Sequence, residues 1–359
     1  MPDTRVGQAI AALSAKCWTD NPPAFQLHSP QLRALLPALK AAGVLTLIQE
    51  RLEKLDNLSP QLLRRIREYC REQLMQCAQH ELRLKLVYQR LRANGIEPVL
   101  IKGWSVTRHY ANPMARFTLD VDVCVPREQL SVAEKVISEL GLPLGSIDLH
   151  GGIDDLADRG WQAVFDRTEL EPLHGDQVRV LCPEEQLRLV CLHFWRHRCN
   201  RAVWLCDIAA LLEARSKAFD WDLCLAGRRR DADRIKAAVS LAAKLLKARL
   251  DAPWGEEAIK RLPDWLVNSV LEGWRQRPDS TEDRKGIMRL VASAFFNPLD
   301  PIRTVNRLPI GPYHSERTMK WLTRLIMPAV VLIRVVRDTT APWKSHETAT
   351  VELHRKVVS

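Results

Sequence analysis

Hydrophobic residues recur at steps of three and four positions through most of residues 30–93, and this spacing predicts helices. Ser59 followed by Pro60 is typical of a helix start, because serine caps the first backbone N–H groups and proline is tolerated in the first turn. The pair Asn94-Gly95 is typical of a helix end. We therefore expect a helical region over residues 1–94.

The spacing then changes to short apolar runs, which predict strands at residues 98–101, 119–125, 147–150 and 178–181. A short helix is expected over residues 105–110, and a longer one over residues 127–140. Strands that alternate with helices in this way predict an α/β core, here over residues 95–182.

Helical spacing returns from residue 183 onward. Helices are predicted at residues 184–214, 231–250, 255–274 and 283–296, which together form a C-terminal helical domain over residues 183–296. Residues 297–359 combine an irregular proline-rich stretch with a last amphipathic helix at about 316–337. The predicted fold class is α+β and mostly α, with a small α/β core between N-terminal and C-terminal helical domains.

The composition is that of a folded chain with an excess of positive charge. Of its 359 residues 46% are hydrophobic and 27% are charged, which excludes collagen-like and broadly disordered classes. Lys and Arg number 53 against 43 Asp and Glu, a formal net charge of +10. This charge favours an anionic partner, either a nucleoside triphosphate or nucleic acid. Nucleic acid has the weaker support, because basic and aromatic residues are not interleaved in any recognisable motif.

The cellular location is predicted from signals that the sequence lacks. It shows no apolar run of the roughly 18 residues that a transmembrane helix needs, and no signal-peptide pattern at its start. Its nine cysteines form no CxxC pair, so we expect reduced thiols in a cytoplasmic protein. The apolar side of residues 319–337 fits a core or dimer helix, with peripheral attachment to a membrane as the alternative.

The clearest chemical signal lies in the second predicted strand, at Asp120 and Asp122. Side chains alternate along a strand, so both carboxylates share one face, roughly 6.6 Å apart. Asp148, flanked by apolar residues in the next predicted strand, would add a third carboxylate. Like charges on one face repel unless cations neutralise them, and Mg²⁺ does so with oxygen ligands. The alternative is an exposed strand face without a metal.

An upstream motif favours the metal interpretation. Lys102 and Gly103 end a predicted strand, and Ser105 follows in a turn into a helix, an arrangement that lets backbone N–H groups approach phosphate. Lys102 and Arg116 fit as partners of a triphosphate, the lysine as a point charge and the arginine as a planar fork. Surface charge, or an ion pair with one of the aspartates, is the alternative for both.

This combination resembles the DNA-polymerase-beta-like nucleotidyltransferase superfamily, in particular its uncharacterised branch, over about residues 30–290. The resemblance rests on a strand ending in Lys-Gly, a Tyr and an Arg before an Asp-x-Asp strand, a later strand with Asp and His, and helical His and Trp-x-x-Asp motifs. The matching positions are Val99 to Gly103, Tyr110, Arg116, Leu119 to Val125, Ile147 to His150, His193, His197 and Trp204 to Asp207.

The resemblance implies a short mixed sheet in the core and a nucleotidyltransferase activity. The protein would transfer a nucleoside monophosphate from a nucleoside triphosphate such as ATP to an acceptor hydroxyl, and release pyrophosphate. Asp120, Asp122 and Asp148 would hold two Mg²⁺ or Mn²⁺ ions, and Asp148 would also activate the acceptor. Gly103 and Ser105 would cradle the triphosphate. Further residues that would contact substrate or support the ligands are Tyr110, His150, His193, His197 and Asp207.

Neither the acceptor nor the choice of nucleotide follows from the sequence; a protein, a peptide and a small molecule all remain open as acceptors. Two positions depart from the superfamily pattern. Trp104 stands directly after the glycine, where a small residue is usual, and would crowd the phosphates unless it points into the core. Leu119 stands where small residues are common. The alternative function is therefore a catalytically inactive protein that binds nucleotide or a partner and keeps the fold.

The cluster from Cys191 to Cys199 contains metal-ligand residue types. On a helix, only His193 and His197 share a face, which argues against a zinc site. Packing or substrate contact is expected for these histidines, with Asp207 pairing a His or an Arg.

Two further polar groups have structural alternatives. His150 would orient Asp148, touch the substrate, or serve as an ordinary structural histidine. The run from Arg228 to Arg230 is expected to be a solvated helix cap, with binding of a phosphate-bearing acceptor as the alternative.

Overall fold

The computed structural model describes residues 4–118, 120–142 and 147–275, all within one compact unit. The helices predicted at 283–296 and 316–337, and the proline-rich stretch between them, lie outside the described residues. Among those described, none of the helices has both the length and the apolar character needed to cross a membrane.

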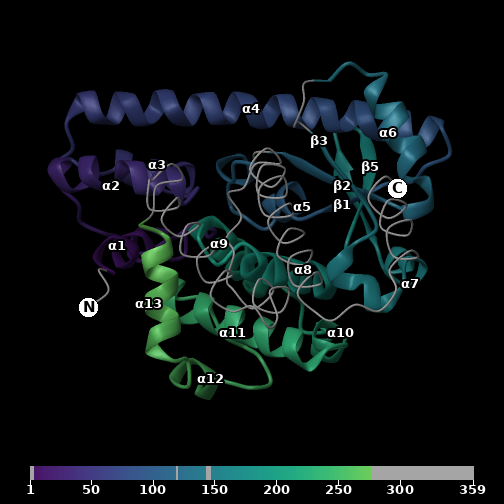
Figure 1. Cartoon of the computed structure of the whole chain (residues 1–359). Helices are drawn as coiled ribbons and strands as arrows, with labels where there is room; N and C mark the ends of the chain where they lie inside the picture. The colour runs from purple at the N-terminus through teal and green to yellow at the C-terminus, as the bar shows by residue number, and fades with distance from the viewer. Residues whose placement is uncertain (1–3, 119, 143–146, 276–359) are drawn as a thin grey trace, which may run out of the picture. The chain divides into compact units, whose positions relative to one another are not determined.

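Four helices open the chain (Figure 1); α2, α3 and α4 occupy the stretch where the hydrophobic spacing predicts helices, and α1 precedes it. The last of them, α4, begins after Ser59, whose hydroxyl accepts a hydrogen bond from the backbone N–H of Leu62 at 3.4 Å. It ends at Asn94 and Gly95, where the glycine φ of 73° lets the chain leave the helix. The bounds are α1 (Arg5–Ser14), α2 (Ser29–Ala41), α3 (Leu45–Glu53) and α4 (Pro60–Ala93).

A five-stranded mixed sheet forms the α/β core, with strand order β3-β2-β1-β5-β4. Strand β2 runs antiparallel to β1 and parallel to β3, β1 runs parallel to β5, and β4 runs antiparallel to β5. The four predicted strands are confirmed, and β4 is an additional edge strand. The bounds are β1 (Val99–Ile101), β2 (Val121–Val125), β3 (Ile147–Gly151), β4 (Glu169–Leu173) and β5 (Asp176–Val180).

Short helices connect the strands. Helix α5 follows β1 directly, and the helix predicted over 127–140 is a 3-10 turn that continues into α6. The bounds are α5 (Gly103–Thr107), η1 (Pro113–Ala115), η2 (Arg127–Gln129), α6 (Leu130–Ser138), η3 (Asp154–Arg159) and α7 (Trp161–Asp166).

The C-terminal helices of the described residues divide more finely than predicted. The single helix expected over 184–214 is two helices, because Arg198 and Cys199 adopt left-handed φ angles of 53° and 59° between them. The helix expected over 255–274 is likewise interrupted ahead of Pro263. The bounds are α8 (Pro183–Arg196), α9 (Ala202–Ala214), α10 (Trp221–Leu225), α11 (Arg229–Leu246), α12 (Glu257–Lys260) and α13 (Asp264–Gly273).

The two faces of the sheet pack on different helices. Leu100, Val121 and Val123 belong to a core shared with α4 and α6. Ile101 and Cys124 point to the opposite face, into a core shared with α7 and α8. Because side chains alternate along β2, Asp122 lies on this second face.

The N-terminal and C-terminal helices share one hydrophobic core, although the sheet separates them in sequence. This core contains Ile10 of α1 and Leu39 of α2 together with Phe194 of α8 and Leu241 of α11, all fully buried. The fold is therefore a mostly helical α+β arrangement around a small mixed sheet, as predicted.

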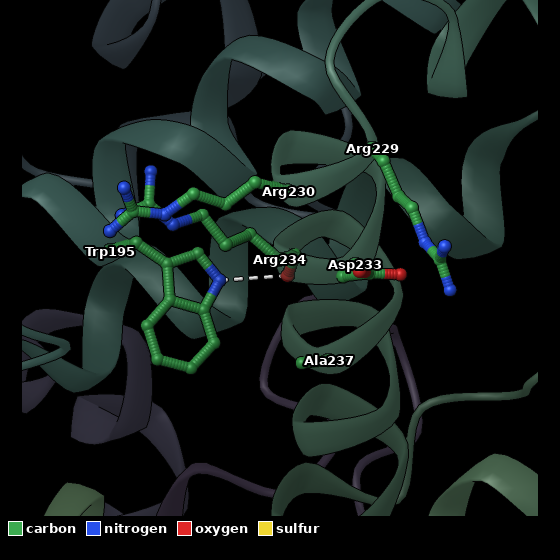
Figure 2. A pocket seen from close by; sticks show the side chains of 6 residues that line it. All are labelled: Trp195, Arg229, Arg230, Asp233, Arg234 and Ala237. Atoms are coloured by element: carbon green, nitrogen blue, oxygen red, sulfur yellow. Dashed lines mark hydrogen bonds between the residues drawn. The ribbon is translucent and has the colours of Figure 1, made fainter.

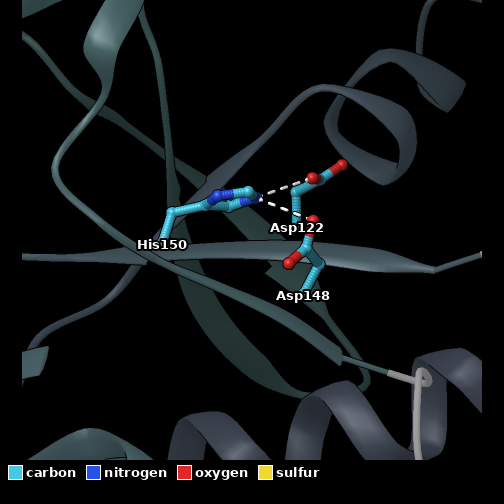
Figure 3. Close-up of side chains that lie close together, drawn as sticks. All are labelled: Asp122, Asp148 and His150. Atoms are coloured by element: carbon cyan, nitrogen blue, oxygen red, sulfur yellow. Dashed lines mark hydrogen bonds and ion pairs between the residues drawn. The ribbon is translucent and has the colours of Figure 1, made fainter. Parts of the chain in front are cut away.

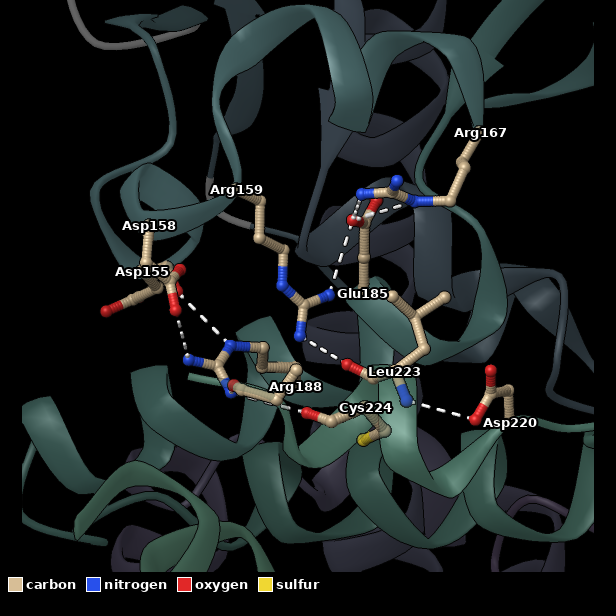
Figure 4. Close-up of polar contacts among 10 residues, drawn as sticks. Asp155, Asp158, Arg159, Arg167, Glu185, Arg188, Asp220, Leu223 and Cys224 are labelled. Atoms are coloured by element: carbon tan, nitrogen blue, oxygen red, sulfur yellow. Dashed lines mark hydrogen bonds and ion pairs between the residues drawn. The ribbon is translucent and has the colours of Figure 1, made fainter. Parts of the chain in front are cut away.

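Buried charged side chains connect η3 and α7, which follow β3, to the C-terminal helices (Figure 4). The carboxylate of Glu185, on α8 and fully buried, accepts hydrogen bonds from Arg159 at 3.3 Å and from Arg167 at 2.5 Å. The guanidinium of Arg188, also buried, donates to the backbone carbonyl of Ala226 at 2.7 Å. These charges are compensated by one another and by carbonyl groups, so they hold η3, α7, α8 and α10 in a fixed arrangement.

Candidate active site

Asp122 and Asp148 are paired residues of neighbouring parallel strands. They face each other in the register of β2 and β3, so their side chains project from the same side of the sheet. Asp122 is 7% exposed, whereas the side chain of Asp148 is about half exposed. Asp148 therefore stands on the strand next to Asp122, and its part in catalysis stays a prediction.

Asp120 stands immediately before β2 and belongs to the same group of charges. Burial raises the pKa of Asp120, and the carboxylates of Asp122 and Asp148 raise this pKa further. Asp120 is therefore close enough to Asp122 and Asp148 for their charges to oppose its ionisation, as expected beside a site that a cation completes.

Two side chains of the protein compensate this negative charge. The Lys102 amine donates to Oδ1 of Asp122 at 2.6 Å, and the Nε2 atom of His150 lies 2.9 Å from the same oxygen. The same Nε2 lies 3.2 Å from an oxygen of Asp148, and the His150 ring points this nitrogen at both carboxylates (Figure 3). Hydrogen bonds to Asp122 and Asp148 raise the pKa of His150 to about 9, and the bond from His150 lowers the pKa of Asp148.

Lys102 reaches Asp122 from a backbone conformation that is rare for a residue with a side chain. Its φ of 55° places it in a region that glycine prefers, directly at the end of β1. The buried hydroxyl of Ser105 donates to the Lys102 carbonyl at 2.6 Å and holds this turn. A Cβ on Gly103 would lie 3.2 Å from the methyl group of Thr118, so glycine permits the close approach of the following loop. Ser105 thus stabilises the turn between β1 and α5. Its contact with phosphate stays a prediction.

Trp104 points away from the carboxylates. Its indole N–H donates to a carboxylate oxygen of Glu81 on α4 at 3.0 Å, and the ring packs on the core between the sheet and α4. The sequence suggests that Trp104 could crowd the phosphates, but its side chain lies on the face of the sheet opposite to Asp122.

Tyr110, Arg116 and Asp207 form a buried network that joins the β1–β2 connection to α9. The Arg116 guanidinium donates to both oxygens of Asp207, at 2.8 and 2.6 Å, and the Tyr110 hydroxyl donates to the same carboxylate at 2.7 Å. Burial opposes the charge of Arg116, but the carboxylate of Asp207 outweighs this effect and raises the pKa of Arg116.

This network changes the interpretation of Arg116. The sequence predicts that it binds triphosphate, but the structure places its guanidinium on Asp207, only 6% exposed. The pairing of Asp207 with an Arg, by contrast, agrees with expectation. Tyr110, Arg116 and Asp207 are therefore positioning residues, which anchor the loop that ends at Asp120.

His193, His197 and Trp204 form a ring cluster across α8 and α9. The two imidazole centroids are 4.2 Å apart, and each lies about 5 Å from the Trp204 ring, at 4.9 and 5.0 Å. Burial lowers the pKa of His197 to about 4, and the positive charges of Arg196 and Lys102 contribute. Burial and nearby positive charges, that of Lys102 among them, also lower the pKa of His193. The cluster is therefore neutral and lies within the electrostatic reach of Lys102.

The donor set of the carboxylate site fits a divalent ion. Among the residues that the structure describes, Asp122, Asp148 and His150 each place a ligand atom within 4.8 Å of the others. Carboxylate oxygens suit Mg²⁺ and Mn²⁺, and an imidazole nitrogen suits transition-metal ions. Within the same described residues, the stretch from Cys191 to Cys199 forms no such grouping. His150 thus lies with the two carboxylates, where the sequence leaves open that it orients Asp148, touches the substrate or is structural.

A separate pocket of about 500 Å³ lies between α8 and α11. In Figure 2 the guanidinium groups of Arg230 and Arg234 lie beside Trp195, while Arg229 points away from it. The predicted helix cap is present, since α11 begins at Arg229 and the run of arginines is exposed. The pocket shares no residue with the carboxylate site; it is lined by Trp195, Arg229, Arg230, Asp233, Arg234 and Ala237.

Comparison with known proteins shows the family of this chain. The family described as "Uncharacterised nucleotidyltransferase" matches residues 28–150 and 144–251, more than half of the chain, and the chain belongs to this family. The protein is thus of the nucleotidyltransferase kind, a class that acts on nucleotides and typically uses divalent metals. The resemblance predicted from the motifs is confirmed.

A solved structure also shows similarity, that of an antigenic nucleotidyltransferase-like protein from Paracoccidioides brasiliensis. It shares 13% sequence identity, with a TM-score of 0.35, and the match covers 48% of this chain and 94% of that chain. No protein among the curated proteins matches this chain.

Proposed function

We propose that the protein is an active, metal-dependent nucleotidyltransferase, which transfers a nucleoside monophosphate from a nucleoside triphosphate to an acceptor hydroxyl. The observation that carries the proposal is the convergence of three carboxylates from two adjacent strands, with Lys102 beside them. Two carboxylates that oppose the ionisation of a third are costly for a purely structural role and suit a site for cations and phosphates.

In this reaction the acceptor oxygen forms a bond to the α-phosphorus, the bond from that phosphorus to the β-phosphate oxygen breaks, and pyrophosphate leaves. A bound divalent ion supplies charge neutralisation for the phosphate oxygens and lowers the barrier to attack. Asp122 and Asp148 would hold the ion with Asp120 beside them. Asp148, the most exposed of the ligand side chains, would take the acceptor proton and pass it to solvent.

Lys102 would bind the triphosphate as a point charge. The Lys102 amine, paired with Asp122 in this structure, would turn toward phosphate oxygens in the loaded site. Backbone N–H groups at Gly103 would assist it, because the chain there turns from β1 directly into α5. The neutral ring cluster of His193, His197 and Trp204 would contact the substrate from the helical side.

The acceptor proposed is a hydroxyl of a protein, a peptide or a small molecule. A nucleic acid acceptor is less favoured, and the exposed arginines beside Trp195 would suit an acceptor that carries phosphate. The proposal places the reaction in the cytoplasm, because all nine cysteines are free thiols.

The second candidate is an inactive protein that binds nucleotide without turnover. The observation that favours it is the close compensation of Asp122 by both Lys102 and His150, which neutralises the carboxylates without an added ion. Calorimetry with a non-hydrolysable triphosphate separates the two: binding that needs Mg²⁺ or Mn²⁺ supports the enzyme, and binding that ignores both supports the inactive protein.

The proposal is tested by labelling with triphosphates that carry label on the α-phosphate, offered with cell extract as the source of acceptor. Label should appear on an acceptor only with a divalent ion present, and Asp120→Ala plus Asp122→Ala should abolish it. Labelling that survives both substitutions would refute the mechanism.

A further inference from the structure

His150 gives the carboxylate site a nitrogen donor that an all-oxygen magnesium site lacks. Its Nε2 atom lies 2.9 Å from an oxygen of Asp122 and 3.2 Å from an oxygen of Asp148. The three ligand atoms lie within 4.8 Å of one another. Atoms on opposite sides of an ion with bonds of about 2.2 Å are roughly 4.4 Å apart, so one ion can be reached by all three.

The placement of His150 follows from the strand on which it stands. Asp148 and His150 are two residues apart in β3 and therefore share a face, and Asp122 pairs with Asp148 across the strands. Among the described residues, the His150 Nε2 atom also contacts the Lys102 amine, at 3.5 Å. The His150 side chain remains 29% exposed.

We propose that His150 Nε2 is a direct ligand of the ion bound by Asp122 and Asp148, and that the site consequently prefers a first-row transition-metal ion such as Mn²⁺ over Mg²⁺. This inference rests on the proposed function, which requires that an ion binds at these carboxylates. Mg²⁺ takes oxygen ligands and retains several waters, whereas an imidazole nitrogen binds transition-metal ions more strongly. One nitrogen with two carboxylates is thus a mixed donor set that discriminates between these ions.

Pulsed electron paramagnetic resonance on the full chain with bound Mn²⁺ tests the ligand directly. The wild-type protein should show ¹⁴N modulation from one coordinated imidazole. The modulation should disappear in His150→Asp and persist in His174→Asn, which removes a histidine at the exposed β4–β5 turn. Bound Mn²⁺ without nitrogen modulation in the wild-type chain overturns the proposal, as does modulation that persists in His150→Asp. This wild-type result does not depend on whether the variant folds.

Competition between the two ions tests the preference. The wild-type chain should bind Mn²⁺ at least tenfold more tightly than Mg²⁺, and His150→Asp should reduce this ratio at least fivefold. Equal affinities in the wild-type chain, or no binding of Mn²⁺ at millimolar concentration, would overturn it.

Failure of this inference is distinguishable from failure of the proposed function. Nitrogen modulation without labelling of any acceptor would uphold the ligand and count against the enzyme. Labelling by a wild-type protein whose bound Mn²⁺ shows no nitrogen coupling would uphold the enzyme and remove the ligand.

Discussion

The amine of Lys102 lies 2.6 Å from Oδ1 of Asp122, so the deepest carboxylate of the site is compensated by the chain itself. The side chains of both residues are largely buried, at 15% and 8% exposure, so water screens their attraction weakly. In the proposed reaction, a divalent ion at Asp122 would have to compete with this amine.

Lys102→Met should therefore bind Mn²⁺ more tightly than the wild-type chain when no nucleotide is present. Removal of the competing amine leaves His150 to compensate the carboxylates, and we expect a gain of about three- to tenfold in affinity, since ~1 kcal/mol of competition corresponds to about fivefold. Calorimetric titration measures this affinity. Lys85→Met is the matched control, because it removes a lysine of α4 that is paired with Asp176 of β5. Unchanged or weaker Mn²⁺ binding in Lys102→Met would contradict the competition.

Trp104→Phe should lower stability slightly and leave nucleotidyl transfer within about twofold of wild type. The substitution removes the hydrogen bond to Glu81, which contributes about 1 kcal/mol, and retains most of the packing against α4. Chemical unfolding and the labelling rate are the two measurements. A labelling rate that rises several-fold would mean that the indole obstructs the phosphates.

In the network of Tyr110, Arg116 and Asp207, loss of the arginine should lower the free energy of unfolding more than loss of the tyrosine hydroxyl. Arg116→Met leaves a buried carboxylate unpaired and should lower the free energy of unfolding by about 3–5 kcal/mol. Tyr110→Phe removes one hydrogen bond and should lower it by about 1–2 kcal/mol. Adding Asp207→Leu to Arg116→Met should recover part of the larger loss, because no buried charge is then left alone. Urea unfolding of the variants tests this order, and additive losses would contradict it.

Stability should fall in acid partly because of His109. Burial and the charge of Arg108 lower the pKa of His109 to about 4, below the usual value of 6.5. The unfolded chain therefore takes up a proton first, so the stabilisation is complete above pH 6.5 and is lost as the pH falls toward 4. The shift corresponds to roughly 3 kcal/mol.

Unfolding free energies of the wild-type chain and His109→Gln, measured from pH 7 to pH 4, test this assignment. The variant should lose less stability over that range than the wild-type chain does. His174→Asn is the control, because its imidazole is exposed and its loss should leave the slope unchanged. Parallel curves for the wild-type chain and His109→Gln would show that His109 is not responsible.

Strand alternation predicts the centre of the site well. Apolar residues flank Asp122 and Asp148, which indicates two strands, and side-chain alternation predicts that Asp120 and Asp122 share a face. The same alternation places His150 on the face of Asp148, but the sequence does not show that its ring contacts both carboxylates. That position depends on the parallel register of β2 and β3, which only the fold defines.

Contacts between residues far apart in the chain cannot be predicted from local sequence patterns. Arg116 and Asp207 are 91 positions apart, so nothing in the local pattern distinguishes an arginine for phosphate from one for a buried carboxylate. Strand β4 is missed because its polar alternation and Pro172 are typical of an exposed edge strand and resemble a loop. The break between α8 and α9 arises from left-handed residues that are not glycine, which no turn signal marks.

The central claim, that Asp122 serves transfer of a nucleoside monophosphate, is tested most directly by parallel reactions with α-labelled and γ-labelled triphosphate in the presence of Mn²⁺. The account predicts that label from the α-position reaches an acceptor and label from the γ-position does not. Asp122→Asn should reduce this transfer about a hundredfold or more, while Asp154→Asn, an exposed aspartate paired with Arg127, should retain it. Transfer of the γ-label, or undiminished α-labelling by Asp122→Asn, would contradict the account.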